Sequence, residues 1–327
     1  MKGTVVFLNR YSGRIILFFI LTLVLLRLTG ADTTLAQSCG RWNVVASPNV
    51  GNAQNYLNSV FAITPNDVWV VGTASGTASS GTLTEHWNGM QWSVVPSPSV
   101  GIYPSLNSVS GVATNDVWAV GNYGVIEHWN GQHWQLVSSS NNGTVLLGVT
   151  AISANDVWAV GSTGGTTQTF IEHWNGTQWS VVPHPDMTSR LYAITAVASN
   201  EVWTVGDALY AQRDQNLIEH WDGNTWKMMY DVSPGCQPSL YGVTALSPTD
   251  VWAVGSAGVW GNCIDGSSNP LIEHWDGTQW SIVSSPNVGS MNNSLNGVSG
   301  LTATTQVWAA GSYTGKTGNN TLIESYC

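Results

Sequence analysis

A short phrase, Asn-Asp-Val-Trp-Ala-Val-Gly, recurs with small changes along the chain and restricts its fold more than any other feature. Its spacing ranges from 40 residues, between Trp118 and Trp158, to 56 residues, between Trp252 and Trp308. Units that repeat at such a period each form one supersecondary element and bury a core by packing on their neighbours. The chain is therefore an array of six equivalent units, marked by Trp69, Trp118, Trp158, Trp203, Trp252 and Trp308.

A second phrase, Glu-His-Trp-Asn/Asp-Gly-x-x-Trp, follows each copy of the first, and its last copy is incomplete. That copy stops at residues 324–327, whereas residues 39–45 at the other end of the chain match the missing half of the phrase. The N-terminus thus supplies what the C-terminus lacks, and the six units form a closed cycle. The complete copies begin at Glu85, Glu127, Glu172, Glu219 and Glu273.

Each unit contains four short runs rich in Val, Ile, Trp and Thr, which is the composition of β-strands. In the fifth unit these runs cover residues 240–246, 251–255, 271–275 and 280–283. A tight turn at 247–250 joins the first two, and the hairpin signal Asp276-Gly277 joins the last two. Four-stranded units at this period are typical of propeller blades. The sequence therefore predicts an all-β, six-bladed β-propeller with four antiparallel strands per blade.

The closed cycle predicts how the ring is completed and where function lies. An N-terminal strand at 41–47 is expected to pair with the strand at 321–326, so that both chain ends build one blade. Most of the length variation between units falls in the second-to-third and fourth-to-first connections. These connections emerge on one face of the ring, which we call the long-loop face. The opposite face carries the tight turns, so we expect function on the long-loop face.

The first 36 residues have the pattern of an export leader. Lys2, Arg10 and Arg14 precede an apolar run at 15–26, and the small residue Ala36 ends the segment. An apolar run of this length is too short to span a bilayer comfortably. We expect residues 1–36 to be a signal peptide or an N-terminal anchor. Residues 37–327 are then a single domain outside the cytoplasm, secreted or attached to the cell surface.

Charge excludes nucleic acid as a partner. The formal net charge is −10, and the chain has 9 Lys and Arg against 19 Asp and Glu. Several of the basic residues lie in the leader, so the remaining domain is more acidic still and a phosphate backbone would be repelled. We expect a monomer that makes no membrane contact beyond the leader. The basic residues of the leader are Lys2, Arg10, Arg14 and Arg27.

Four cysteines, an even number in an exported chain, suggest two disulfides. Aligned on the second phrase, Cys39 and Cys327 flank the missing hairpin turn, so a bridge between them would replace the peptide connection. Closing a loop of nearly the whole domain is worth about 4–5 kcal/mol in the chain-entropy model. Cys236 and Cys263 lie in neighbouring connections of the long-loop face, and they are expected to form the second bridge.

With these phrases, residues 39–327 resemble bacterial secreted repeat propellers, with blades similar to those of tectonin, kelch and Asp-box proteins. Tectonin-like blades also carry a Val-Trp-x-Val phrase followed by an x-Trp-Asn-Gly-x-x-Trp hairpin. That resemblance implies recognition of carbohydrate or of a surface ligand without catalysis. Asp-box blades place Gly two residues after Asp, whereas Gly277 follows Asp276 directly. Likeness between blades supports the fold more strongly than the function.

A Glu-His pair stands at one equivalent position in five units, and it suggests either chemistry or structure. A catalytic or metal site needs residues that converge, whereas the symmetry of the ring separates these pairs. We therefore expect each histidine to hydrogen-bond the acid of the first turn or nearby backbone. The histidines are His86, His128, His173, His220 and His274, and the turn residues are Asp67, Asp116, Asp156 and Asp250, with Glu201 and Gln306 in the equivalent places.

Catalysis is the main alternative to binding. A sialidase-like hydrolase uses three arginines on a substrate carboxylate, and beyond the leader only Arg41, Arg190 and Arg213 exist. Arg41 is assigned to the closing hairpin on the tight-turn face, so this triad is not expected to assemble. The chain has no Gly-x-Ser-x-Gly, His-Glu-x-x-His or phosphate-loop motif. A hydrolase or lyase with paired loop carboxylates, or a structural calcium ion, remains an alternative use of Asp186, Asp207, Asp214, Asp231 and Asp265.

Residues that break the repeat are the candidate ligand contacts. Trp260 is the single tryptophan, of 18, outside the two phrases, and it lies three residues before Cys263 in the longest connection. An exposed indole on such a loop is a platform for a sugar ring or for a partner protein. The alternative is that each loop aromatic covers a small core of its own. The expected ligand-binding residues are Trp260, Tyr103, Tyr123, Tyr210 and Tyr313, with the pair Arg213 and Asp214.

Together these features predict an exported, non-enzymatic propeller that binds a glycan or a cell-surface protein through its long-loop face. No catalytic residue, metal ligand or cofactor is assigned, apart from the calcium alternative. A purely architectural role in a cell envelope is the third hypothesis.

Overall fold

A computed structural model describes most of the chain beyond the leader. The chain divides into two compact units, Met1–Ala46 and Ser47–Cys327, and every described strand belongs to the second. Among the described residues no helix is long and apolar enough to cross a membrane. The leader predicted at 1–36 lies outside the described residues, which are 45–50, 54–75, 80–101, 104–164, 168–185, 189–208, 216–229, 236–258, 267–288, 291–301, 306–315 and 318–326.

The strands follow the repeat. The first three blades contain β1 (Gln54–Thr64), β2 (Asp67–Ser75), β3 (Ser80–Trp87) and β4 (Trp92–Val94); β5 (Leu106–Ala113), β6 (Asp116–Gly121), β7 (Ile126–Trp129) and β8 (Trp134–Val137); and β9 (Thr144–Ser153), β10 (Asp156–Thr163), β11 (Thr169–Trp174) and β12 (Trp179–Val181). The last three contain β13 (Ser189–Ala198), β14 (Glu201–Ala208), β15 (Asn216–Trp221) and β16 (Trp226–Met228); β17 (Cys236–Ser247), β18 (Asp250–Gly258), β19 (Ser268–Trp275) and β20 (Trp280–Ile282); and β21 (Met291–Leu301), β22 (Gln306–Gly315) and β23 (Gly318–Tyr326).

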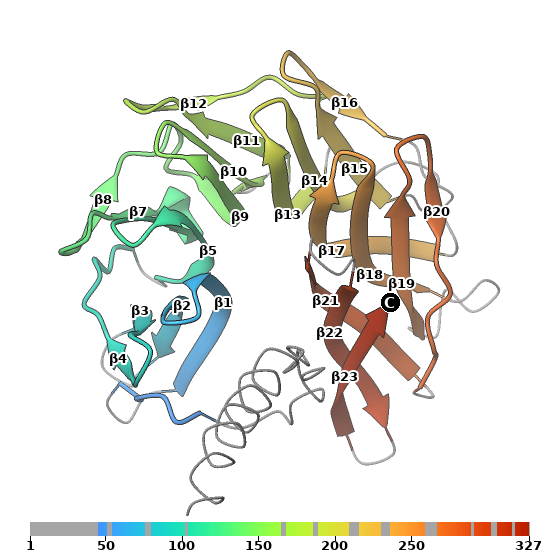
Figure 1. Cartoon of the computed structure of the whole chain (residues 1–327), viewed down its shortest axis with the longest axis horizontal. Helices are drawn as coiled ribbons and strands as arrows, with labels where there is room; N and C mark the ends of the chain where they lie inside the picture. Colours follow the sequence, from blue (N-terminus) through green and yellow to red (C-terminus); the bar gives the residue numbers. More distant parts are fainter. Residues whose placement is uncertain are drawn as a thin grey trace, which may run out of the picture. The chain divides into compact units, whose positions relative to one another are not determined.

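These strands form six separate antiparallel sheets, which confirms the predicted six-bladed β-propeller. In each sheet the strands lie in sequence order, so neighbours in the chain are neighbours in space. Figure 1 shows the blades standing around a central opening, with β5, β9, β13 and β17 on the inner side and β8, β12, β16 and β20 on the outer side. Consecutive inner strands pack on one another from β1 through β21.

The sixth blade differs from the others in its described part. Five sheets have four strands, whereas the sheet of β21, β22 and β23 has three within the described residues. The N-terminal strand predicted at 41–47 is only partly covered: residues 41–44 lie outside the described residues, and Val45 to Ser47 belong to no strand. The predicted strand was too long at this end, because outer strands span only three or four residues before the chain leaves for the next blade.

Tryptophans build the junctions between blades. Trp69 of β2 is almost fully buried, and it packs against two tryptophans of the next blade. Its ring centroid lies 4.9 Å from that of Trp129 in a tilted pair and 5.2 Å from that of Trp134 in an edge-on pair. The same pattern recurs at the next three junctions. Since β6 of blade 2 lies between two neighbouring blades, its sequence is a continuous apolar run rather than an alternating one.

The glycine that ends the first phrase is required by close approach of two strands. A side chain at Gly206 would collide with the carbonyl oxygen of Arg190 in the neighbouring inner strand, and the equivalent glycines meet the same obstacle. A register shift in the inner strand, between Leu191 and Ala193, lies beside this contact. At the outer hairpins, Gly277 adopts φ +92°, as the Asp-Gly signal predicts.

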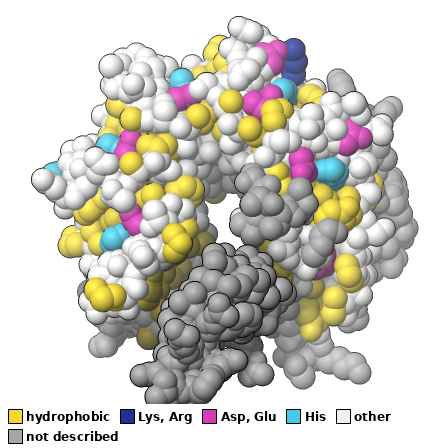
Figure 2. All heavy atoms as spheres, viewed as in Figure 1, with side chains coloured by type: hydrophobic (Ala, Val, Ile, Leu, Met, Phe, Trp, Pro, Cys, Tyr) yellow, Lys and Arg dark blue, Asp and Glu magenta, His cyan; other side chains and the backbone are white. Residues whose placement is uncertain are grey.

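The repeated histidines are tied to the turn acids, as expected. His86 Nε2 lies 2.8 Å from Asp67 Oδ1, and His220 Nε2 lies 2.9 Å from Glu201 Oε1, so Glu201 does replace the usual Asp. Figure 2 shows imidazoles beside carboxylates around the ring on the face in view. These pairs are spread over five blades rather than gathered in one site, which favours the structural interpretation. The other pairs are His128 with Asp116, His173 with Asp156, and His274 with Asp250.

Candidate functional site

A groove of about 490 Å³ opens on the long-loop face of blade 2. One wall is the short 3₁₀ turn η1 (Asn122–Gly124), which forms the second-to-third connection of this blade. The other walls come from the fourth-to-first connections on either side, at residues 100–101 and 138–142, and from the end of β8. The groove therefore lies where the repeat predicts variable loops and not between the repeated phrases.

Tyr123, one of the predicted ligand-binding residues, stands at the edge of this groove. Its backbone is left-handed, with φ 61° and ψ 29°, and its side chain is 46% exposed. Such a conformation is unfavourable for a bulky residue and persists only where the surroundings fix it. Here the turn is closed by Gly121 N–H bonding to Val125 O at 2.9 Å. A Cβ placed on Gly101 would lie 3.2 Å from the ring of Tyr123, so this glycine leaves room for the ring.

The floor of the groove is aliphatic and its rim is polar but uncharged. Val125 and Ile126 are buried beneath it, whereas Leu136 is 48% exposed on its side. Hydroxyl and amide groups come from Ser138, Ser139 and Asn142, and no lining residue carries a formal charge. An apolar surface with a few polar groups and an aromatic edge is the usual make-up of a ligand site.

A buried carboxylate fixes the wall beside the groove. Glu172 of β11 accepts hydrogen bonds from Ser139 Oγ at 3.0 Å and from Ser140 N at 3.0 Å and Oγ at 2.6 Å. Burial raises the pKa of Glu172, and the bonds from the two serines offset only part of that effect. The connection that carries these serines is thereby held to blade 3, so the groove is largely preformed.

The other predicted ligand contacts are not gathered at this groove. Tyr313 lies in β22 of blade 6, where it pairs with Asn320 and packs beside the cluster of Val254, Leu295, Ala309 and Leu322. It is therefore far along the ring from Tyr123 in blade 2. Tyr103, Tyr210, Arg213, Asp214 and Trp260 lie outside the described residues.

Sequence reasoning missed a polar cluster on the first two strands of blade 4. Tyr192 Oη donates to Asp207 Oδ2 at 2.9 Å, and Arg190 N donates to Asp207 Oδ1 at 3.2 Å. Burial, reinforced by the charge of Asp207, raises the pKa of Tyr192 to about 12, so the phenol keeps its proton at neutral pH. The ring also meets that of Tyr241 in blade 5, with centroids 5.4 Å apart. The signal for these tyrosines was their place directly after the buried leucine of each inner strand.

The alternatives that involve loop acids are mostly beyond the described residues. Asp207 is engaged by Tyr192, whereas Asp186, Asp214, Asp231 and Asp265 are not described. Of the arginines considered for a hydrolase, only Arg190 is described. Within the part of the chain that the structure describes, no group of acidic, histidine or cysteine side chains could hold a metal ion.

Cys236 is disulfide-bonded and almost completely buried at the start of β17. It pairs across the sheet with Gly258, the last residue of β18, so it stands at the base of the connection that carries Cys263. Its bonding partner lies outside the described residues, as do Cys39, Cys263 and Cys327. The predicted pairings of Cys236 with Cys263 and of Cys39 with Cys327 therefore stay predictions.

Comparison with known proteins shows the fold. No protein-family model and no curated protein matches this sequence. Among solved structures, YCF48 bound to a D1 peptide is 12% identical with a TM-score of 0.51, covering 81% of this chain and 96% of that one. YCF48 from Cyanidioschyzon merolae is 13% identical with a TM-score of 0.50, covering 84% of this chain and 96% of that one. These two similarities extend over almost the whole of the other chain.

A glycoside hydrolase is also similar in structure. The GH74 enzyme of Niastella koreensis is 10% identical with a TM-score of 0.54, and the match covers 77% of this chain but only 43% of the enzyme. Binding proteins and enzymes thus share this architecture, and likeness at such identities shows a β-propeller and nothing finer.

Proposed function

We propose that residues 37–327 form an exported, non-enzymatic binding propeller that holds an uncharged segment of a partner protein in the groove around Tyr123. The observation that carries the proposal is the uncharged groove of about 490 Å³ with an aliphatic floor. Such a floor suits an apolar side chain of a peptide, with the exposed ring of Tyr123 as its lid and the rim hydroxyls as hydrogen-bond partners. That YCF48 has been solved with a bound peptide supports the idea that this fold serves peptide recognition.

Export is supported by two independent features. The leader pattern at residues 1–36 precedes the domain, and Cys236 is disulfide-bonded, which is typical of oxidising compartments. We propose no catalytic role because of the contacts and burial of the described acidic side chains. The turn acids bond histidines, as Asp67 does, and five of the repeated glutamates are buried: Glu85, Glu127, Glu172, Glu219 and Glu273.

The proposal is tested by a screen of peptides and surface proteins with residues 37–327, together with a glycan array and a polysaccharide panel. Two variants probe the groove, Tyr123→Ala and Leu136→Ser. The matched control is Val181→Ser, because Val181 occupies the same outer-strand position in blade 3, is 54% exposed and lies outside the groove.

We expect a peptide ligand whose affinity falls about tenfold or more in both groove variants and stays unchanged in the control. Binding of glycans alone, or release of reducing ends from a polysaccharide, would replace the proposal with one of its alternatives. A peptide that binds all variants equally would move the site away from Tyr123.

A further inference from the structure

Blade 4 departs from the repeat at three neighbouring positions near the long-loop face. Arg190 and Tyr192 flank the buried leucine of β13, and Asp207 follows the glycine of close approach in β14. At the positions of Arg190 and Asp207 no other blade carries a charged residue, so the shared fold does not account for these two charges. The equivalent residues are Tyr56, Ser105, Val145, Ser239 and Ser294 for Arg190, and Thr73, Asn122, Ser162, Ser256 and Ser312 for Asp207.

Arg190 and Asp207 occupy a cross-strand position that the fold does not need to be charged. They lie directly opposite each other in the pair of β13 and β14, whereas two serines oppose each other at this position in blades 5 and 6. The exposed Arg190 side chain has no ion pair among the described residues. Lys227, the other Lys or Arg in the described part of the chain, is paired with Asp222. The Arg190 guanidinium is therefore the one available to an anionic ligand there.

Tyr192 replaces a residue that ties neighbouring blades together. In blade 2 this position is Asn107, whose Nδ2 donates to Leu146 O of the next inner strand at 2.8 Å, and Asn58 of blade 1 makes the equivalent bond. The Tyr192 hydroxyl instead donates to Asp207 of its own blade. Blade 4 has thus exchanged a contact between blades for a polar group at the long-loop face.

Tyr241 of blade 5 completes a compact cluster with these side chains. Its ring meets that of Tyr192, with centroids 5.4 Å apart and planes at 61°. Figure 1 shows β13 and β17, which carry the two tyrosines, on the inner side of the ring, and the two strands pack on one another. We call Arg190, Tyr192, Asp207 and Tyr241 the Arg190 cluster.

The Arg190 cluster combines a cation, hydrogen-bond acceptors and two aromatic rings. Each oxygen of the Asp207 carboxylate accepts one bond, from Arg190 N at 3.2 Å or from Tyr192 Oη at 2.9 Å, so each keeps a lone pair for a further donor. Burial and the charge of Asp207 raise the pKa of Tyr192 to about 12, so the phenol keeps its proton. Arg190 lies close enough to offset part of this effect, and its guanidinium has several N–H donors.

These groups fit a sugar that carries a carboxylate. A guanidinium binds a carboxylate through two parallel hydrogen bonds, and the free lone pairs of Asp207 can accept from sugar hydroxyls. A tyrosine ring provides an apolar surface for the C–H face of a pyranose. A phosphate group fits less well, because its second negative charge would face Asp207 in a chain of net charge −10.

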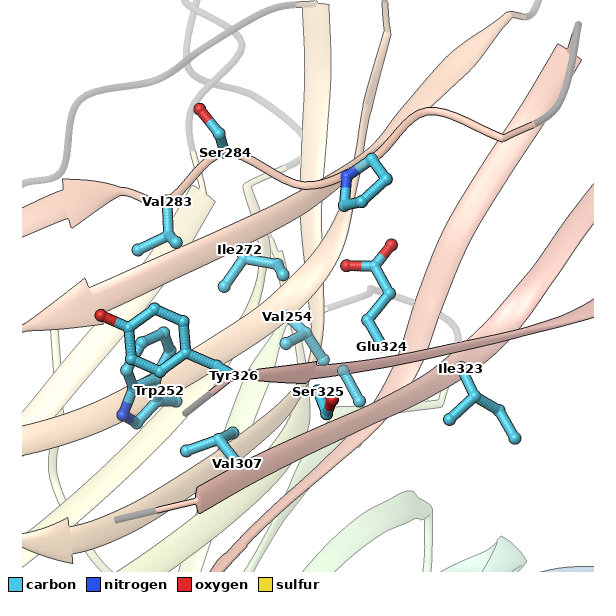
Figure 3. Close-up of a pocket in the computed structure, with 12 residues that line it drawn as sticks. Trp252, Val254, Ile272, Val283, Ser284, Val307, Ile323, Glu324, Ser325 and Tyr326 are labelled. Atoms are coloured by element: carbon cyan, nitrogen blue, oxygen red, sulfur yellow. The ribbon is translucent and has the colours of Figure 1, made fainter. Parts of the chain in front are cut away.

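The cavity of about 220 Å³ between blades 5 and 6 offers no such set of groups. Its described lining is mainly aliphatic and aromatic, and Figure 3 shows the Tyr326 ring lying over the indole of Trp252. Glu324, the one charged residue in that lining, already accepts hydrogen bonds from Ser285 Oγ at 2.8 and 2.9 Å. The Arg190 cluster is therefore better suited to a charged, hydroxyl-rich ligand than this cavity is.

We propose that the Arg190 cluster binds a uronic acid unit of an oligosaccharide, with the Arg190 guanidinium on the carboxylate, Asp207 on the hydroxyls and a tyrosine ring against the pyranose. This site belongs to blades 4 and 5, whereas the groove at Tyr123 belongs to blade 2. The two sites differ in ligand and in residues, so each can fail without the other.

Calorimetric titration of residues 37–327 with oligosaccharides of galacturonate, mannuronate and glucuronate tests the proposal. Methyl-esterified oligogalacturonate is the matched ligand, because the ester removes only the charge. The variants are Arg190→Ser and Tyr192→Asn, which introduce the residues of other blades at these positions and so preserve the fold. Lys227→Ser is the control, since it removes the same charge from an outer strand where β4, β12 and β20 carry serine.

We expect at least one uronate oligosaccharide to bind, with an affinity that falls about tenfold or more on esterification and in Arg190→Ser. Tyr192→Asn should weaken binding as well, whereas Lys227→Ser and Tyr123→Ala should leave it unchanged. Failure of all three uronates to bind would overturn the proposal, and so would equal affinity for the methyl ester, a comparison that needs the wild type alone. Equal affinity in Arg190→Ser, or binding of acidic peptides or inorganic phosphate in place of uronates, would also overturn it.

Discussion

The Asp116 carboxylate joins His128 to Trp118: its Oδ1 lies 2.8 Å from His128 Nε2 and accepts the Trp118 Nε1–H at 2.9 Å. The imidazole in turn stacks on the indole, with centroids 4.2 Å apart. One acid of a tight turn therefore orients an aromatic pair at the centre of a junction between blades. The same arrangement recurs in other blades, so disrupting it should lower the stability of the propeller rather than its affinity for a ligand.

Asp116→Ala is expected to destabilise the propeller by about 2–4 kcal/mol, because the buried Trp118 indole N–H and the half-buried His128 imidazole lose their common partner at once. Urea denaturation followed by tryptophan fluorescence gives the change in the free energy of unfolding. His133→Ala is a suitable control, since His133 is exposed in an outer hairpin. A change below about 0.5 kcal/mol in Asp116→Ala would contradict the structural role.

Stability should rise on acidification from pH 8 to pH 5, the reverse of ordinary acid unfolding. Burial raises the pKa of Glu127 from 4.5 to about 8, with a nearby hydroxyl of Ser97 offsetting only part of the effect. Glu127 thus binds a proton more tightly in the folded state than in the unfolded state. The stability gained from this proton is complete below pH 4.5 and is lost as the pH rises towards 8. Between pH 4.5 and 8, each unit of rise in pH lowers the free energy of unfolding by about 1.4 kcal/mol through Glu127. Burial raises the pKa of Glu85, Glu172 and Glu324 too.

Glu127→Gln should therefore be more stable than the wild type at pH 8 and no more stable at pH 4.5. Denaturation midpoints measured at pH 4.5, 5, 6, 7 and 8 reveal the difference between the two pH profiles. Asp276→Asn provides the control. Hydrogen bonds from Thr278 and Gln279 lower the pKa of Asp276, so this carboxyl group does not titrate in this range. A parallel pH profile for Glu127→Gln and the wild type would refute the assignment.

Gly206→Ala should cost at least about 2 kcal/mol, since the added methyl group meets the Arg190 carbonyl oxygen and the inner strand would have to move. At Gly143 the nearest atom to an added Cβ is the Asn141 side-chain oxygen at 3.3 Å, so Gly143→Ala should be nearly neutral. Thermal unfolding of the two variants gives the comparison. Equal melting temperatures would show that the strands are less closely apposed than described.

Peptide mapping without reducing agent should recover Cys236 linked to Cys263. Cys236 lies at the base of the connection that carries Cys263, opposite Gly258 in the sheet, so a bridge there needs no long-range rearrangement. Recovery of Cys236 joined to Cys39 or Cys327 would contradict both this pairing and the predicted link between the chain ends.

The sequence was sufficient for the blades because each repeated residue has one physical task. The Asn-Asp-Val-Trp-Ala-Val-Gly phrase contains the turn acid, the junction tryptophan and the glycine of close approach, and all three stand where the repeat predicts. The histidine partner of the acid was also predicted, since a buried polar ring must find an acceptor.

The groove was harder to predict because its residues are ordinary in sequence. Leu136 occupies the same outer-strand position as Val94 and Val181. It lines the groove only because the neighbouring connections form the other walls. The left-handed conformation of Tyr123 depends on a turn that no other blade shares among the described residues. Tyr192 and Tyr241 were missed because a register shift, invisible in the sequence, brings them together across two blades.

In the first five blades the tryptophan of the second strand also packs against an aromatic ring of the following blade, and this has a consequence for how blades can be added to such a chain. A duplicated stretch of one full period would carry one half of a junction at each end, and the two halves would fit the existing neighbours. The number of blades in this architecture is then set by the number of periods in the chain and by the angle between neighbouring blades. An added blade needs no new kind of contact.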